Sequence, residues 1–329
     1  MLKRLFFLTL FLFLLFASHP FILGAMLFKK DDKARVYVKR YVTEAISYIY
    51  QIGFNSKLYS SGNYIPSNIT SNNIDILIGN HISMLDFFIY FILINRLDGR
   101  DYYILTKKQV LFFPFANFNL IGELNLNRKI EKDEKNIEKF INKINNGVII
   151  IFPEGTRKTK KKLIKSQKYS EDNGLHKFNN FLYPKMRGLH TIIKTLMNNN
   201  KLGNIVDVTT VVHKLRNKDF NSSRFFFKKW GNTYCHIETY KIPNDTRLLD
   251  YDYFKQWFLQ IWIIKDNIID NMDKFIYKRI TYNIKSSTYI ISLISLIFMF
   301  YMYANTMGIY PLSILFITCV LSFIKYKKL

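Results

Sequence analysis

A histidine and an aspartate stand five positions apart between two apolar segments, in the stretch IGNHISMLDFF from Ile78 to Phe88. Each residue advances about 100° around a helix, so side chains five positions apart point about 140° away from each other. His81 and Asp86 can therefore meet only if the histidine lies in a turn and the aspartate lies in the first turn of the following helix. Ser83 favours that arrangement, because S-x-x-D is close to a capping box with Ser83 as the N-cap residue.

The pair has two interpretations on these residues alone. Asp86 can be a helix-start carboxylate that the helix dipole favours, with His81 as an ordinary turn residue. Alternatively, Asp86 accepts a hydrogen bond from one ring nitrogen of a neutral His81 and leaves the other nitrogen free as a general base. The second interpretation requires further groups that bind the substrate.

A second polar stretch, IIIFPEGTRKTK from Ile149 to Lys160, offers such groups at the end of an apolar run. Gly155 permits positive φ or a close backbone approach, and Thr156 with neighbouring backbone N–H groups can donate to an oxyanion or a phosphate. Arg157 presents a planar fork that suits phosphate. The alternative is an ordinary β-turn with a surface arginine, although strand-end loops are where α/β folds bind ligands.

Strands and helices alternate along the middle of the chain, which predicts an α/β fold with a mostly parallel sheet flanked by helices. The predicted strands are Ile74–Ile78, Tyr102–Thr106, Val148–Phe152, Ile205–Val212 and residues 235–242. The predicted helices are Phe87–Leu97, Glu131–Ile144, Leu189–Met197 and Asp250–Phe275.

Two segments of this region have a distinctive composition. The helix predicted over Asp250–Phe275 carries a broad aromatic face, which we expect to pack on the domain rather than lie on a bilayer. The lysine-rich stretch KTKKKLIKSQK is predicted to be a solvated loop.

The chain of 329 residues has a net charge of +24, which favours an anionic partner such as a membrane surface, phosphorylated substrates or nucleic acid. Part of this charge lies in lysine-rich runs that we interpret as solvated surface. The two cysteines, Cys235 and Cys319, are far apart, so neither a disulfide framework nor a cysteine-based zinc site follows.

Hydrophobic segments at both ends predict membrane attachment. Leu5–Phe28 has no charged residue and exceeds the ~20 residues that cross a bilayer, so we expect a retained anchor rather than a cleaved signal peptide. Tyr289–Tyr303 and Tyr310–Ile324 are shorter and predict a hairpin that either spans the bilayer or re-enters it. The basic residues that follow the first segment place the middle of the chain in the cytosol.

The two polar stretches together resemble the signatures of glycerolipid acyltransferases, the lysophosphatidate acyltransferase superfamily. NHISMLD (Asn80–Asp86) resembles the family's N-H-x-x-x-x-D block, and FPEGTR (Phe152–Arg157) resembles its second signature, in the same order. Between them, Lys108, Pro114 and Arg128 resemble a third block, although Asn117 stands where a glycine is usual. Past them, Pro184–Gly188 resembles a turn of the lysocardiolipin and lysophosphatidylinositol acyltransferase-like branch.

This resemblance implies a function and a role for each residue. His81 would take the proton of a glycerol hydroxyl, Asp86 would hold His81, and the hydroxyl would attack the thioester of acyl-CoA. Substrate binding would fall to the second signature, with Arg128 as a further cation; its residues are Glu154, Gly155, Thr156 and Arg157. No metal and no cofactor beyond the acyl-CoA substrate is implied.

The implied enzyme is an acyl-CoA-dependent 1-acylglycerol-3-phosphate O-acyltransferase of phospholipid biosynthesis, in the endoplasmic reticulum or another organelle membrane. An alternative is remodelling of lysophosphatidylinositol or lysocardiolipin. A second alternative is a non-catalytic basic membrane protein, for which loss of His81 or Asp86 would be expected. We expect no nucleic-acid partner, because no RNA-recognition pattern is visible. The oligomeric state does not follow from the sequence.

These expectations divide the chain into four parts. Residues 1–40 form the membrane anchor with its basic flank, and residues 41–245 form the catalytic domain. Residues 246–284 form an amphipathic, aromatic helical region, and residues 285–329 form the C-terminal membrane segments.

Overall fold

The computed structural model describes residues 57–64, 73–83, 86–97, 100–107, 124–126, 130–212, 231–240 and 246–280. In these residues the strands are β1 (Leu58–Gly62), β2 (Ile74–Gly79), β3 (Tyr102–Lys107), β4 (Leu124–Leu126), β5 (Gly147–Ile151), β6 (Leu202–Val212), β7 (Thr233–Tyr240) and β8 (Lys278–Ile280). The helices are α3 (Asp86–Leu97), α4 (Ile130–Lys143), α5 (Lys160–Asp172), α6 (Arg187–Asn198) and α8 (Tyr251–Asp270), with 3₁₀ turns η4 (Thr246–Leu249) and η5 (Met272–Lys274).

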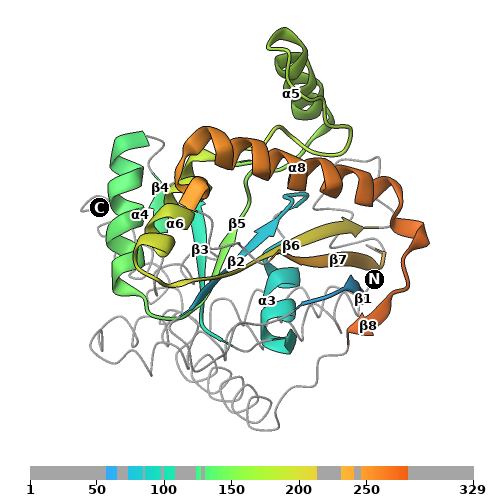
Figure 1. The fold of residues 1–329 in the computed structure, drawn as a ribbon. Helices are drawn as coiled ribbons and strands as arrows, with labels where there is room; N and C mark the ends of the chain where they lie inside the picture. The colour runs from blue at the N-terminus through green and yellow to red at the C-terminus, as the bar shows by residue number, and fades with distance from the viewer. Residues whose placement is uncertain are drawn as a thin grey trace, which may run out of the picture.

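The strands form one sheet in the order β4-β3-β5-β2-β6-β7-β1-β8 (Figure 1). Neighbours run parallel except in the pairs β6–β7 and β1–β8. The α/β class and the mostly parallel sheet are therefore confirmed, with an antiparallel contribution that makes the sheet mixed. All of β2 and β5 is buried, as expected of parallel strands that helices cover on both faces.

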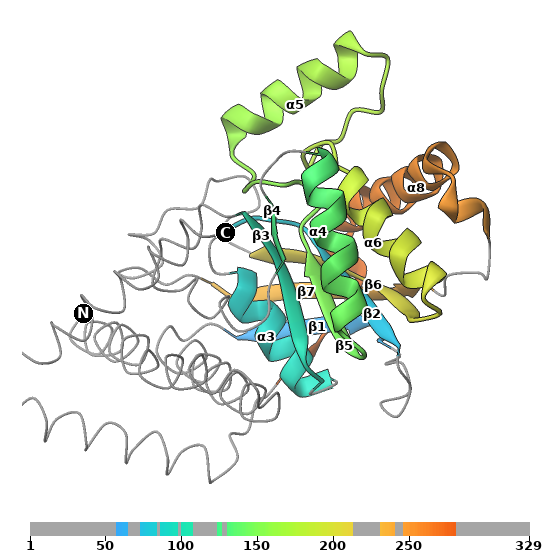
Figure 2. The same cartoon turned by 90° about the vertical axis from the view of Figure 1, so that its left-hand side faces the viewer.

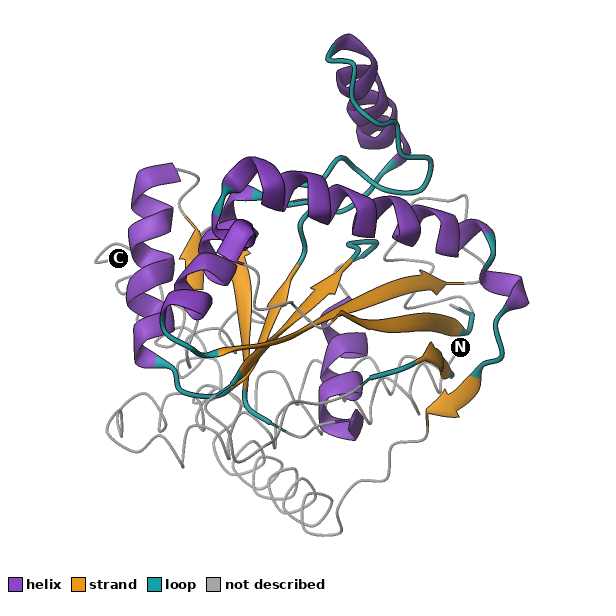
Figure 3. Ribbon diagram, viewed as in Figure 1, coloured by secondary structure: helices purple, strands orange, loops and turns teal. Residues whose placement is uncertain are grey.

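Helices cover the two faces of the sheet unequally (Figures 1, 2 and 3). Helix α3 packs on one face, against a buried cluster that includes Leu77, Ile150 and Val208. Helices α4, α6 and α8 pack on the other face, against a cluster that includes Ile76 and Ile149. Side chains alternate between the faces of a strand, so neighbouring residues of β2 and β5 contribute to different clusters.

The predicted strands and helices are confirmed, with shifts of a few residues at their ends. The aromatic helix ends at Asp270 rather than Phe275, and η5 follows it. Its apolar face packs against the protein as expected, since Phe254, Phe258 and Trp262 are fully buried. The short strands β1, β4 and β8 were not predicted, because each has only three to five residues and none contains a continuous apolar run.

The prediction of a solvated loop for the lysine-rich stretch is wrong, because Lys160–Asp172 forms helix α5. The Thr159 side chain accepts a hydrogen bond from the Lys162 N–H at 3.3 Å, as an N-cap residue does. Lysine and glutamine also favour helix at exposed positions. A polar helix of this kind lacks the apolar stripe by which helices are recognised.

The predicted membrane segments, Leu5–Phe28, Tyr289–Tyr303 and Tyr310–Ile324, lie outside the described residues. Among the residues that the structure does describe, no helix combines the length and the apolarity needed to cross a bilayer. The division of the chain into four parts stays a prediction.

Candidate active site

The two polar stretches meet because β2 and β5 are parallel neighbours. Ile78 of β2 pairs with Ile151 of β5, so the loops after both strands leave the same edge of the sheet. The chain continues from β2 through α3 to one face, and from β5 toward α6 on the other face. Open α/β sheets bind ligands at the carboxyl ends of strands whose connections diverge in this way.

Asn80 fixes the turn that carries the histidine. Its amide nitrogen donates to the Thr210 carbonyl at 2.9 Å, and its amide oxygen accepts from the Thr210 N–H at 2.7 Å. The preceding residue, Gly79, packs so closely that a Cβ atom there would lie 1.9 Å from the Tyr90 hydroxyl. Both contacts restrict the path of the backbone into His81.

His81 and Asp86 are in direct contact, with Nδ1 and Oδ2 separated by 2.9 Å. The break between them that the helical geometry required is present, since His81 lies before the helix and Asp86 is in the first turn of α3. The Asp86 carboxylate also accepts from the N–H groups of Ile82 at 2.7 Å and Ser83 at 2.9 Å, and from the Ser83 hydroxyl at 2.9 Å. The bond from the Ser83 N–H is one half of the predicted capping box.

These contacts determine which nitrogen of the imidazole is available. The buried Asp86 carboxylate accepts from every other neighbour named above, so Nδ1 of a neutral His81 carries the proton and donates it. Nε2 is then the unprotonated nitrogen. The His81 side chain is 16% exposed, and Nε2 has no hydrogen-bond partner among the described residues.

Phe152 supports the ring of His81 from the end of β5. The two ring centroids lie 4.8 Å apart with an interplanar angle of 30°. Phe87 and Tyr90 in turn contact Phe152 edge-on, at 5.4 and 5.1 Å. The imidazole therefore has an aromatic wall on one side.

Glu154 is buried and joins three separate parts of the chain. Its Oε1 accepts from the His81 N–H at 2.8 Å, and its Oε2 accepts from the Leu182 N–H at 3.0 Å. Burial raises the pKa of Glu154, and the two backbone hydrogen bonds oppose that shift. With both oxygens occupied and 1% of the residue exposed, this position favours holding the His81 backbone over the predicted direct contact with substrate.

We predict that Glu154→Gln lowers the turnover rate while the protein still folds. A glutamine can accept only one of the two backbone hydrogen bonds, and its NH₂ group would face the other N–H. An unmet buried donor costs roughly 1–3 kcal/mol, which corresponds to a rate loss of about 5- to 150-fold if all of it falls on the position of His81. Initial rates and thermal melting of both proteins test this.

The matched control for this variant is Glu138→Gln, because Glu138 is an exposed glutamate on α4. The control is expected to keep the full rate. A Glu154→Gln protein that also keeps the full rate would show that the carboxylate does not position His81.

The loop after β5 brings backbone and cationic groups beside His81. Gly155 has a φ of +64°, a conformation that glycine adopts readily. The Lys158 N–H donates to the His81 carbonyl at 2.8 Å. Lys162 Nζ donates to the Thr156 hydroxyl at 2.7 Å and to the Arg157 carbonyl at 3.1 Å.

Positive charge is concentrated at this loop. Partial burial lowers the pKa of Lys162, and the charge of Arg157 lowers it further. Arg157 itself is exposed. The turn Pro184–Gly188 also reaches the loop, since the Lys185 N–H donates to the Pro153 carbonyl at 2.7 Å. A Cβ atom on Gly155 would lie 3.1 Å from the Lys185 side chain.

The structure thus brings together His81, Asp86 and the second polar stretch. Arg128 lies outside the described residues, as do Lys108, Pro114 and Asn117. Sequence reasoning missed the ring contact of Phe152, the bonds from Asn80 to Thr210, and the approach of Lys185. For these contacts the sequence offered one local signal, the change from apolar to polar residues at Phe152. The other contacts join residues that are distant in sequence, so no local pattern reveals them.

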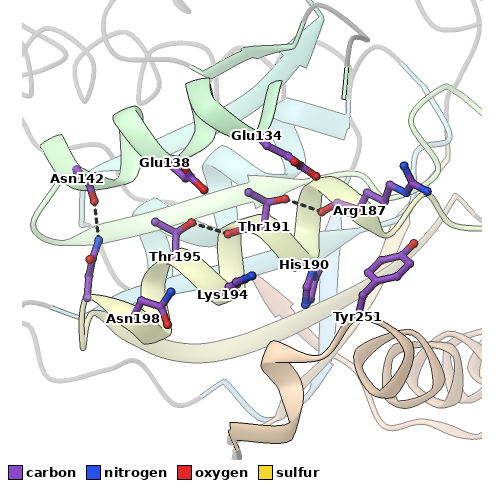
Figure 4. Close-up of a pocket in the computed structure, with 11 residues that line it drawn as sticks. Glu134, Glu138, Asn142, Arg187, His190, Thr191, Lys194, Thr195, Asn198 and Tyr251 are labelled. Carbon is purple, nitrogen blue, oxygen red and sulfur yellow. Dashed lines mark hydrogen bonds between the residues drawn. The ribbon is translucent and has the colours of Figure 1, made fainter. Parts of the chain in front are cut away.

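A separate open cavity of about 480 Å³ lies between α4 and α6 (Figure 4). Glu134 and Glu138 line one wall, and Arg187, His190 and Lys194 line the other. It contains none of the residues of the His81 site. The candidate active site is defined by the hydrogen-bonded geometry around His81.

An α/β sheet with a histidine–carboxylate pair beside a cationic strand-end loop defines a candidate site for proton abstraction from a substrate that carries an anion. Residues 61–180 match the model of the Acyltransferase family, and this part of the chain is a domain of that family. The matched region contains the whole His81 pair and the stretch Phe152–Arg157.

Two curated relatives carry more specific names. A probable 1-acyl-sn-glycerol-3-phosphate acyltransferase 5 of Arabidopsis thaliana is 25% identical over 227 residues, 66% of this chain and 57% of the relative. Lysophosphatidylinositol acyltransferase 10 of Caenorhabditis elegans is 24% identical over 170 residues, 50% of this chain and 43% of the relative. The chain thus spans less than three-fifths of the length of these relatives.

Among solved structures, the 1-acyl-sn-glycerophosphate (LPA) acyltransferase PlsC from Thermotoga maritima matches with a TM-score of 0.48 at 16% identity. The match covers 79% of this chain and 92% of the PlsC chain.

Proposed function

We propose that this protein is a membrane-bound acyltransferase that moves a fatty acyl group from acyl-CoA to the free hydroxyl of a lysophospholipid. The preferred acceptor is 1-acyl-sn-glycerol-3-phosphate, and the product is phosphatidate. The observation that carries the proposal is the His81 imidazole beside a cationic loop. Asp86 holds its Nδ1 at 2.9 Å, and its Nε2 has no hydrogen-bond partner in the part of the chain that the structure describes. The family of residues 61–180 supports it.

The proposed reaction uses one nitrogen of His81. Nε2 takes the proton of the acceptor hydroxyl as its oxygen attacks the thioester carbonyl, and the negative charge of Asp86 stabilises the imidazolium. When the tetrahedral intermediate collapses, the carbon–sulfur bond breaks and an ester remains. The sulfur leaves as CoA thiolate, which takes the proton back from His81. No acyl-enzyme, metal or further cofactor takes part.

The phosphate of the acceptor is assigned to the loop after β5. Arg157 is exposed at the loop and carries the planar fork that suits phosphate. Thr156 contributes a hydroxyl, and Gly155 permits the turn. Lys162 and Lys185 add positive charge from the neighbouring segments. Arg128 remains a further proposed phosphate contact.

We predict that Arg157→Gln raises the KM for lysophosphatidate about tenfold or more while changing kcat little. A charge-assisted hydrogen bond contributes about 1.5–3 kcal/mol, and this one would form equally in the ground state and the transition state. Lys185→Gln should act in the same direction. The control is Lys143→Gln, at an exposed position of α4. An unchanged KM in the Arg157 variant would remove this residue from the phosphate site.

A second acceptor is favoured by one comparison, because the C. elegans relative is named for lysophosphatidylinositol. An acceptor panel with acyl-CoA and the reconstituted protein distinguishes the two. Phosphatidate as the main product supports the preferred acceptor, and phosphatidylinositol or cardiolipin supports a remodelling enzyme. Absence of any acyl transfer across the panel would contradict the proposed function and favour a non-catalytic membrane protein.

The proposal also includes the setting of the enzyme. Segments 5–28 and 289–324 would anchor the chain in the endoplasmic reticulum or another organelle membrane, and the domain of residues 41–245 would face the cytosol. The net charge of +24 supports a partner with an anionic surface.

A further inference from the structure

Helix α5 stands away from the body of the protein at the edge of the sheet that carries His81 (Figures 1 and 2). Polar contacts on one side fix its position. The Ser166 hydroxyl accepts from the Tyr183 N–H at 2.8 Å, and the Gln167 amide donates to the Phe178 carbonyl at 2.9 Å. The Ser170 carbonyl accepts from the Leu175 N–H at 2.8 Å. The helix is therefore attached through its inner side and exposes the other.

The outer side of α5 combines positive charge with apolar side chains. Lys161, Ile164, Lys165 and Lys168 follow the i, i+3, i+4, i+7 spacing of one helix face, and all of them are exposed. Ile164 is 58% exposed, and Tyr169, beside this face, is 51% exposed. The three lysines have no hydrogen-bond or ion-pair partner within the described part of the chain.

The outer side of α5 carries positive charge with few acidic residues to balance it. α5 contains five lysines, whereas its two acidic residues, Glu171 and Asp172, stand together at the last turn. Glu171 is paired with Lys177 in the following loop. Among the described residues, two of the four exposed large apolar side chains belong to this helix.

We propose that α5 is an interfacial element that docks on the surface of an anionic phospholipid bilayer. Lysines near such a surface are attracted to anionic headgroups, and their long stems let apolar neighbours approach the acyl boundary. Ile164 and Tyr169 supply those apolar neighbours. A soluble partner would have to neutralise three like charges within about two turns, while a bilayer with anionic lipids provides a continuous negative surface.

Docking of α5 would also place the His81 site at the lipid surface. α5 follows directly after the loop whose Lys158 N–H bonds the His81 carbonyl. Lys162, in the first turn of α5, bonds both Thr156 and Arg157. The proposed contact with lipid is argued from α5 alone and does not depend on the proposed reaction. If that reaction takes place, the lysophospholipid acceptor would be supplied from the same lipid surface.

A fluorescent label on α5 tests the contact in the full chain. In a Cys319→Ser background, Ile164→Cys is labelled with an environment-sensitive dye. Cys235 is fully buried, and burial raises the pKa of its thiol to about 12, so it should stay unlabelled. We expect blue-shifted, brighter emission after reconstitution in vesicles that contain phosphatidylglycerol, and a return toward the aqueous spectrum in vesicles of phosphatidylcholine alone.

Charge reversal provides the matched comparison. Lys161→Glu, Lys165→Glu and Lys168→Glu together should lower the ratio of docked to undocked α5 by about 100-fold or more, at about fivefold per lysine. The control reverses three exposed lysines of α4, Lys132, Lys135 and Lys139, and should leave the label in lipid. High salt should weaken docking of the unreversed protein. Circular dichroism checks that both variants fold.

Three outcomes would overturn the proposal. The label could remain in an aqueous environment in anionic vesicles, or both triple variants could lose docking equally. The label could also respond to acyl-CoA in phosphatidylcholine vesicles and not to phosphatidylglycerol, which would make α5 a binding site for the phosphates of the donor. A His81→Ala protein should dock normally, so failure of the proposed reaction and failure of docking remain distinguishable.

Discussion

Replacing His81 with alanine is expected to lower the rate of acyl transfer by about 10²- to 10⁴-fold. The variant loses the imidazole whose Nδ1 is held by the Asp86 carboxylate and whose Nε2 is the proposed base; no other group of the described site has this arrangement. It should still fold, because Asp86 keeps its bonds from Ile82 and Ser83. Initial rates with lysophosphatidate and acyl-CoA, in equal amounts of reconstituted protein, give the measurement.

Two controls separate chemistry from folding in this experiment. His176→Ala removes an exposed histidine from the loop after α5 and should keep the full rate. Free imidazole should restore part of the lost rate to His81→Ala and none to a protein that is misfolded. A folded His81→Ala protein with a rate near that of the unaltered chain would contradict the general-base role.

Replacing Lys265 with methionine is expected to lower the free energy of unfolding by about 3–5 kcal/mol. Lys265 is fully buried on α8, and its Nζ bonds Asp207 Oδ1 at 2.7 Å, the Val208 carbonyl at 2.8 Å and the Thr209 hydroxyl at 3.2 Å. Burial lowers the pKa of Lys265 and raises the pKa of Asp207, while each charge offsets part of the other's shift. Methionine would leave the Asp207 carboxylate buried without its cation.

A second variant tests whether the unpaired charge causes this loss. Lys265→Met combined with Asp207→Asn removes both charges and should regain at least half of the stability. Lys255→Met, on the same helix but only partly buried, should cost little. Chemical denaturation of the detergent-solubilised proteins gives the values. A Lys265→Met loss as small as the Lys255→Met loss would show that the pair does not stabilise the fold.

The sequence was sufficient to predict the strands and helices that show a recognisable pattern of apolar residues. Strand β5 is a continuous apolar run, β2 is apolar except for Asp75 in the stretch Ile74–Ile78, and α4 has a regular apolar stripe, so each was predicted in the right place. Helix α5 was missed because it is rich in lysine and has no continuous apolar stripe, and it is attached to the protein largely through hydrogen bonds of Ser166 and Gln167. Short strands such as β8 depend on a distant partner, since β8 pairs with β1.

In the candidate site too, contacts between residues close in sequence could be anticipated, whereas contacts between residues far apart in sequence could not. The contact between His81 and Asp86 was one of two interpretations that the spacing of five residues allowed, and the structure shows that the contact is made. The Glu154 bond to His81 and the Asn80 bonds to Thr210 join residues 73 and 130 positions apart, which no local pattern reveals. Asp207 did give a signal, because a carboxylate inside an apolar strand requires a buried partner. The identity of that partner, Lys265, required the fold.

The four hydrogen bonds that Asp86 accepts have a consequence for the order of events in the proposed reaction. Its Oδ2 accepts from Nδ1 and two backbone N–H groups, so the carboxylate acts as a fixed charge and not as a relay that passes the proton onward. The proton that enters at Nε2 must then leave from Nε2. The acceptor hydroxyl and the thioester sulfur must both reach that single atom within one turnover. Donor and acceptor are therefore expected to occupy the site together, and initial-rate kinetics should give intersecting rather than parallel double-reciprocal lines.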